Sequence, residues 1–331
     1  MSVQPVVEYA SRTDVGMRRS ANQDSLAVRL CTESEDWATC GHLFVVADGM
    51  GGHSVGDLAS RITVDTLPHA YFKGNADNVR DRLLQAVIAA NKAVNDCGRQ
   101  NPEFADMGTT CCALSLSEAG ATIAHVGDSR IYRVRNGRIE QLTFDHSLQW
   151  EMIRLGQATI ENVDLHHPRN VITRCIGPDP DVRPDIEGPF PVRAGDYFVI
   201  SSDGLTNHVS DSEIGQIVSC QPVAESARLL INLANCRGGS DNSTVIVVHV
   251  QSYPSADVDD ATGEHSLSTV SPVRHHGYRR YKVGAVVSAI GGLVLEGFAV
   301  RYFRDGDWNI GTVLAVTGVL LWVISYLFLI L

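Results

Sequence analysis

Four segments of strand-like composition each carry an aspartate at one end. These aspartates are Asp48, Asp128, Asp203 and Asp241. Taken singly, each fits an ordinary turn, because Asp-Gly and Asp-Asn pairs are common where a strand reverses. Carboxylates at the ends of neighbouring strands project into one cleft, however, and several of them cannot crowd together without a cation. The four positions together therefore predict a site for divalent metal ions.

The oxygen-rich character of this predicted site favours Mg²⁺ or Mn²⁺, since hard cations prefer oxygen ligands and retain several waters. A few carboxylates and one backbone carbonyl then suffice. Gly49 follows Asp48 directly and allows the sharp turn that brings its carbonyl close to an ion. Two ions about 3.5–4 Å apart can acidify a water and clamp the oxygens of a phosphoryl group. The predicted chemistry is hydrolysis of a phosphate ester without a covalent enzyme intermediate.

Strands and helices that could position these aspartates alternate within residues 1–252. Apolar, β-rich runs predict strands over residues 43–47, 121–126, 197–201 and 244–250. Apolar residues at helical spacing predict helices over residues 57–67 and 78–95. This order indicates a mixed α and β domain.

Six motifs in this domain closely match, in order, those of the metal-dependent protein phosphatases of type 2C. They span residues 16–24, 48–53, 108–110, 127–130, 202–204 and 241–242. Each motif is weak alone, but six in the right order over about residues 7–250 make a specific resemblance. It implies hydrolysis of phosphoserine and phosphothreonine in proteins. It also implies an α+β fold, a four-layer α/β/β/α sandwich of two antiparallel sheets flanked by helices.

The resemblance also assigns metal ligands. It implies that Asp48 bridges two ions, Mn²⁺ or Mg²⁺, and that the Gly49 carbonyl binds one of them. Asp203 and Asp241 would bind the other ion. Asp128 matches the ligand of a third, weaker ion.

Further residues near the metals are assigned in the same way. Arg19 matches the arginine that binds the substrate phosphate, a task that suits a planar guanidinium, and Arg18 is set aside only by its spacing from Asp24. Asp24 resembles an acceptor that orients metal-bound water. Met50 stands where some family members have a histidine that protonates the leaving oxygen. His53 could act as this general acid or make a structural hydrogen bond, and a metal-bound water could serve instead.

Residues 145–174 resemble the flap segment of bacterial members, with a predicted helical piece over 148–155. Long loops beside an active site usually govern access, so we expect substrate selection there. Asp164, His166 and His167 could be taken for a metal cluster, an interpretation that their polar loop disfavours.

The composition changes near residue 252. Residues 253–282 predict a flexible linker with a basic end, and residues 283–331 predict a hairpin of two transmembrane helices. The second apolar stretch exceeds the roughly 20 residues that cross a bilayer, whereas Glu296 interrupts the first. Basic residues before the first span place that flank in the cytoplasm. We therefore expect a multi-pass protein of the cytoplasmic membrane, with its catalytic domain in the cytoplasm.

The formal net charge of −11 argues against nucleic acid as a partner. The expected partners are phosphoproteins, a serine/threonine kinase with its substrates, and the membrane. Two alternatives remain: a pseudophosphatase that binds phosphoproteins without turnover, and a phosphatase of phosphorylated anti-sigma antagonists. The Arg19 motif and the full flap favour the general phosphoprotein class over the latter.

Overall fold

The computed structural model describes residues 5–31, 37, 39–51, 55–104, 106–156 and 171–253. All of these belong to one compact unit, Met1–Val258; a second unit, Asp259–Leu331, lies outside the described residues. The predicted hairpin and nearly all of the predicted linker therefore lie outside them as well. No helix in the described ranges is long and apolar enough to cross a membrane.

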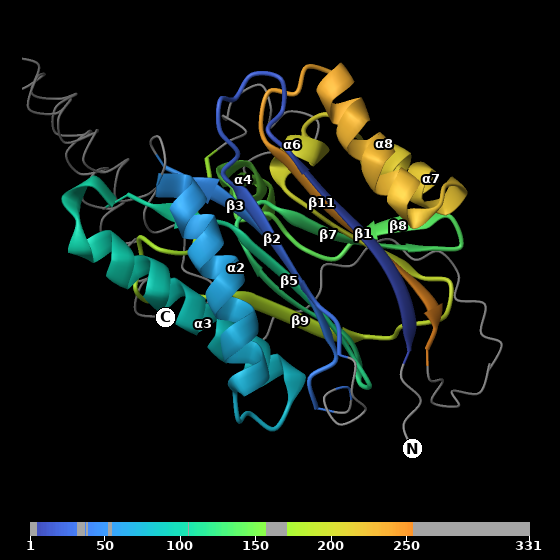
Figure 1. Cartoon of the computed structure of the whole chain (residues 1–331), viewed down its shortest axis with the longest axis horizontal. Coiled ribbons are helices and arrows are strands. Elements are labelled where there is room, and N and C mark those ends of the chain that lie inside the picture. The colour runs from blue at the N-terminus through green and yellow to red at the C-terminus, as the bar shows by residue number, and fades with distance from the viewer. Residues whose placement is uncertain are drawn as a thin grey trace, which may run out of the picture. The chain divides into compact units, whose positions relative to one another are not determined.

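Two antiparallel sheets form the centre of the described unit (Figure 1). The first has the strand order β1-β11-β10-β7-β8. Its strands are β1 (Val6–Asp14), β7 (Arg130–Arg135), β8 (Arg138–Gln141), β10 (Tyr197–Ser201) and β11 (Ser243–Ser252). The second sheet has the order β2-β3-β5-β6-β9, with β4 paired to β3. Its strands are β2 (Asp24–Arg29), β3 (His42–Met50), β4 (Gly108–Thr109), β5 (Cys111–Ser117), β6 (Gly120–Val126) and β9 (Asp185–Phe190).

Helices cover the outer face of each sheet. Figure 1 shows α2 (Val55–Lys73) and α3 (Val79–Gln100) over the second sheet, and α7 (Asp211–Cys220) and α8 (Val223–Cys236) over the first. Three further helices in the described ranges are short. They are η1 (Pro102–Phe104), α4 (Leu148–Arg154) and α6 (Asp203–Thr206).

Alternation along β3 shows how these layers arise from the sequence. Leu43, Val45 and Ala47 pack into the core that α2 and α3 share with the second sheet. Phe44 and Val46 point the other way, into the core between the two sheets. Because successive side chains of a strand face opposite sides, a continuous apolar run is what a strand buried on both faces requires. A third core lies between the first sheet and α7 and α8. The predicted four-layer sandwich is thus confirmed.

The two predicted helices are present and longer than predicted. The first continues beyond residue 67 because Pro68 is accommodated within α2, where it is buried. The second begins after Asn78, whose side chain accepts a hydrogen bond from the Asp81 amide and so caps α3. Each predicted strand likewise falls within a strand of the structure.

Candidate functional site

Asp48 lies near the end of β3, and its backbone is held by hydroxyl groups. The Asp48 amide donates to Thr110 Oγ1 at 2.9 Å, and the Asp48 carbonyl accepts from Thr109 Oγ1 at 2.8 Å. Thr110 Oγ1 also lies 2.7 Å from Ser129 Oγ, in the loop after β6. Both threonines and Ser129 are fully buried. The hydroxyl chain therefore ties the Asp48 backbone to the neighbouring loop that carries Asp128.

Gly49 is required by close packing of helix α2 against β3. A Cβ at Gly49 would lie 2.1 Å from the Gly56 carbonyl oxygen, which belongs to the first turn of α2. The Gly49 amide donates to the Gln23 carbonyl at 3.1 Å. The sequence explains Gly49 by a sharp turn that brings its carbonyl near an ion. The structure adds a second reason, since only glycine leaves room for helix α2 here.

Asp24 lies directly opposite Asp48 in the β2–β3 pairing. Its Oδ2 accepts a hydrogen bond from Ser202 Oγ at 2.8 Å, whereas its buried Oδ1 has no partner among the described residues. Burial, followed by the charges of Asp203 and Asp241, raises the pKa of Asp24 to about 6, despite hydrogen bonds that lower it.

Asp203 and Asp241 meet because β10 and β11 are adjacent, with Ser201 opposite Val245. Asp203 begins α6 and Asp241 precedes β11. Burial and then the Asp241 charge raise the pKa of Asp203, and a hydrogen bond with Asp48 offsets part of this rise. Asp203 Oδ2 also accepts from the Asn207 side chain at 3.0 Å.

Arg19 lies at the rim of this arrangement. Its Nη2 donates to Asp241 Oδ2 at 2.8 Å, and half of its side chain is exposed. Arg18, the competing candidate, makes no ion pair within the described part of the chain. Of the two arginines, Arg19 is therefore the one in contact with a predicted metal ligand.

Asp128 follows Gly127, which has a positive φ of 108°. A Cβ at Gly127 would lie 2.6 Å from the Thr110 side chain, so this turn excludes larger residues. Asp128 is buried, and its Oδ1 has no hydrogen-bond partner among the described residues. Burial, and then the charges of Asp203 and Asp145, raise its pKa to about 7.

We call these five residues the aspartate cluster: Asp24, Asp48, Asp128, Asp203 and Asp241. Removal from water raises the pKa of Asp48 well above its ordinary value, and the charges of the other four members raise it further. Hard cations fit such a set, because its donors are carboxylate oxygens, and Asp24 Oδ1 and Asp128 Oδ1 are buried without a hydrogen-bond partner in the part of the chain that the structure describes. No group of three His, Cys, Asp or Glu in the described ranges is already spaced for a metal. Bound waters and the Gly49 carbonyl would complete the donor set.

Other predicted residues fall elsewhere. His53, the candidate acid, lies outside the described residues, as do Asp164, His166 and His167. Met50 pairs with Gly108 at the end of β3.

Sequence reasoning gave no role to Asn242, whose buried amide is fully used. Its Oδ1 accepts from the Gln23 amide at 2.9 Å, and its Nδ2 donates to the Val15 and Ala21 carbonyls, each at 2.9 Å. These bonds hold both ends of the loop that carries Arg19. The Asp-Asn motif contained the residue, but its long-range bonds gave no local signal.

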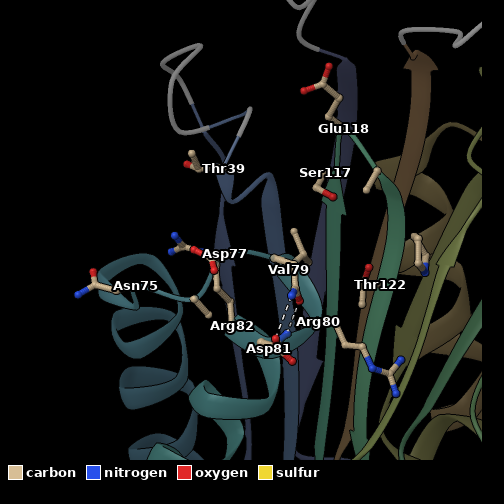
Figure 2. Close-up of a pocket in the computed structure, with 14 residues that line it drawn as sticks. Thr39, Asn75, Asp77, Val79, Arg80, Asp81, Arg82, Ser117, Glu118 and Thr122 are labelled. Carbon is tan, nitrogen blue, oxygen red and sulfur yellow. Dashed lines mark hydrogen bonds between the residues drawn. The ribbon is translucent and has the colours of Figure 1, made fainter.

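A cavity of about 820 Å³ lies away from the cluster (Figure 2). It is lined by the N-terminal end of α3, including Arg80, and by the β5–β6 turn, including Ser117 and Glu118. The opposite ends of β5 and β6 lead to Thr110 and Gly127, beside the cluster. None of the predicted ligands lines this cavity, so it is not the candidate site.

Comparison with known proteins matches this chain to a described family. Residues 17–235 match the family described as Protein phosphatase 2C. A "Putative protein phosphatase 2C-type" of Streptococcus pyogenes is 41% identical over 250 residues, which cover 74% of this chain and 98% of that protein.

Solved structures are similar as well. The serine/threonine phosphatase of S. agalactiae has a TM-score of 0.67 and 38% identity, covering 74% of this chain and 100% of that one. The catalytic domain of the phosphatase PstP, in complex with 2 manganese ions, has a TM-score of 0.63 and 34% identity, covering 73% and 97% of the two chains. The chain therefore belongs to the protein phosphatase 2C family and is an enzyme of the serine/threonine phosphatase type.

Proposed function

We propose that this chain hydrolyses phosphoserine and phosphothreonine esters in proteins at the aspartate cluster, with Mn²⁺ or Mg²⁺ as cofactor. The observation that carries the proposal is the crowding of Asp48 with four other aspartates, which raises its pKa. Carboxylates in this state need divalent cations, and Asp48, Asp203 and Asp241 are each partly exposed.

In this proposal, Asp48 holds two cations, Gly49 contributes its carbonyl to one, and Asp203 and Asp241 hold the other. Asp128 holds a third, weaker cation. When bound, the cations would supply Lewis-acid chemistry by neutralising phosphate charge and making a nearby water more acidic.

Asp24 and Arg19 have complementary proposed tasks. Ser202 occupies Asp24 Oδ2, so Oδ1 can accept a hydrogen bond from the attacking water and orient it. Arg19 can exchange the Asp241 carboxylate for the substrate phosphate, because a guanidinium binds either anion through the same fork of donors. His53 is a candidate general acid for the leaving oxygen; a structural hydrogen bond is its alternative role, and a metal-bound water could then supply the proton.

The proposed substrates are proteins phosphorylated by a serine/threonine kinase of the same cell. This proposal is supported by the sequence relative PstP of Mycobacterium tuberculosis, which is named a serine/threonine protein phosphatase. Comparing phosphosites in cells with and without the protein tests this, and accumulation confined to anti-sigma antagonists would contradict it.

We also propose that residues 283–331 form the membrane hairpin predicted from their composition, which would keep the catalytic domain at the cytoplasmic face. Removing residues 253–331 should move the protein from the membrane pellet to the soluble fraction. Recovery of the full chain in the soluble fraction would exclude the hairpin.

Phosphate release from a phosphothreonine peptide tests the catalytic proposal directly. The full chain should release phosphate with Mn²⁺, and EDTA should abolish the release until Mn²⁺ is restored. Asp203→Asn should be inactive under the same conditions. Binding of the peptide without turnover would instead support a pseudophosphatase, and release that survives EDTA would rule out the metal mechanism.

A further inference from the structure

His146, which the proposed chemistry does not use, is bonded to the residue before Asp128. The His146 amide donates to the Gly127 carbonyl at 2.7 Å, and the Gly127 amide donates to His146 Nδ1 at 3.1 Å. Both backbone polar groups of Gly127 are therefore held by one buried histidine. Thr110 packs against the other side of Gly127, so the loop leading to Asp128 is fixed from two directions.

Asp185, the first residue of β9, orients the His146 ring. Because the Gly127 amide can only donate, Nδ1 is the acceptor and the ring proton resides on Nε2. Nε2 donates to Asp185 Oδ2 at 3.0 Å, and Arg174 Nη1 donates to Asp185 Oδ1 at 3.0 Å. The arrangement is one in which a carboxylate fixes the tautomer and the angle of an imidazole.

The same histidine also joins the base of the predicted flap. The Thr173 amide donates to the His146 carbonyl at 2.8 Å, and the Leu148 amide donates to the Val171 carbonyl at 2.9 Å. Residues 145–148 and 171–174 thus lie side by side as the two stems of the flap segment. Arg174 belongs to the second stem, so Asp185 is bonded to both stems at once.

We infer that His146, oriented by Asp185, is a positioning residue that holds the Asp128 loop and the flap stems in one arrangement. The inference rests on the proposed function, since it gives these residues a part in cation binding at Asp128 and in substrate binding beside the flap. His146 acts through Gly127 and Thr173 and touches neither the cations nor the substrate.

Replacing Asp185 in the full chain tests this assignment. For Asp185→Ala we expect Mn²⁺ binding, measured by calorimetry, to weaken by up to about tenfold, the lower end of the loss seen when a group bonded directly to a metal ligand is removed. The KM for a phosphothreonine peptide should rise, whereas kcat for the small substrate p-nitrophenyl phosphate should change much less. Asp185→Asn keeps an acceptor for His146 Nε2, so its Mn²⁺ affinity and its KM for the peptide should be close to those of the unmodified chain.

Asp196→Asn is the matched control, because Asp196 is a buried, arginine-bonded aspartate away from the cluster. It should lower the Tm without changing Mn²⁺ affinity or peptide KM. If Asp185→Ala behaves in the same way, the inference is wrong.

If Asp185→Ala does not fold, Arg174→Ala removes the second partner of Asp185 at a partly exposed position. A smaller loss in both quantities would support the inference, and no change would overturn it.

The two proposals fail in different ways. Absence of Mn²⁺-dependent phosphatase activity in the unmodified chain would overturn the proposed function. Calorimetry on the same samples would still report whether Asp185 affects cation binding, because it needs no turnover. Equal Mn²⁺ affinity in the unmodified chain and in Asp185→Ala would overturn the positioning role alone.

Discussion

Two groups of aspartates in this domain have opposite electrostatic surroundings. In the aspartate cluster, removal from water and mutual repulsion raise the pKa of four of the five members. Elsewhere, Asp145, Asp185 and Asp196 each accept hydrogen bonds from an arginine. Burial alone would raise the pKa of Asp185, but bonds from His146 and Arg174 hold it below its ordinary value.

The difference separates structural carboxylates from those available for chemistry. Asp196 is fully buried, yet Arg135 donates to it through Nε and Nη2, both at 2.6 Å. Arg130 forms a similar fork with Asp145. In the cluster, only Asp241 has an arginine partner among the described residues, and that arginine, Arg19, is half exposed. The fold thus pairs these structural carboxylates with arginines, whereas the cluster has only the Arg19 contact among the described residues, which fits the proposed binding of metal ions there.

Among the variants that test this difference between the two groups, Asp48→Asn should have the largest effect. We expect kcat to fall roughly 100- to 1,000-fold, the loss seen when one preorganised electrostatic contact is removed. In EDTA, however, the Tm of the variant should exceed that of the unmodified chain, because a repelling charge is gone. Phosphate release and thermal unfolding on the same samples measure both effects. A lower Tm would show that Asp48 is structural after all.

Asp196→Asn probes the opposite group. Asp196 is buried but Arg135 is partly exposed, so losing their ion pair should lower the free energy of unfolding by less than the roughly 3 kcal/mol typical of a fully buried pair. Since Asp196 lies away from the cluster, kcat and KM should stay unchanged at temperatures where the variant is folded. Urea titration with kinetic assays measures this, and a selective loss of kcat would break the distinction between the groups.

Asp128→Asn tests the sign of the pKa shifts through pH. A raised folded-state pKa means that the Asp128 contribution to stability is present below the unfolded pKa and is lost as pH rises towards about 7. In EDTA, the variant should therefore gain a few degrees in Tm over the unmodified chain at pH 7.5, since 1 kcal/mol shifts Tm by about 2–4 °C in such a domain. The gain should shrink at pH 5.

The quantity to compare at each pH is the difference in Tm between Asp128→Asn and the unmodified chain. His42 and His125 have pKa values lowered by burial, to about 4 and about 3, so their contributions are lost as pH falls. These opposing effects are common to both proteins and cancel in the comparison. A gain in Tm independent of pH would contradict the assigned shift of Asp128.

Prediction from sequence succeeded for four apolar strand segments and two helices, although β5, whose residues are all buried, was not among the predicted strands. The apolar run in β3 and the helical spacing in α3 carry their own periodicity, so local patterns suffice. Strand β1 was not predicted, because most of its residues are exposed and polar residues interrupt any alternation. Its position follows from pairing with β11, which local patterns do not record.

The residues of the candidate site likewise divide into those with a local sequence signal and those joined only by long-range contacts. The aspartates were recognisable because each lies in a short motif, and the family resemblance joined motifs far apart in the chain. His146 and Asp185 are 39 residues apart, and their bond depends on how the flap stems fold. Neither residue type nor spacing distinguishes such a pair from two surface residues. The contacts of His146, Asp185 and Asn242 were therefore visible only in the structure.

The pairing of β1 with β11 has a consequence for how the enzyme is made. Val6 and Ser252 are bonded although they are 246 residues apart, and β11 lies between β1 and β10 in its sheet. At ribosomal rates of about 5–20 residues per second, β1 would wait on the order of ten seconds or more for its partner. Asp241 emerges just before β11, so the site cannot assemble on a shorter nascent chain. Synthesis itself thus delays the appearance of phosphatase activity until the first sheet can close.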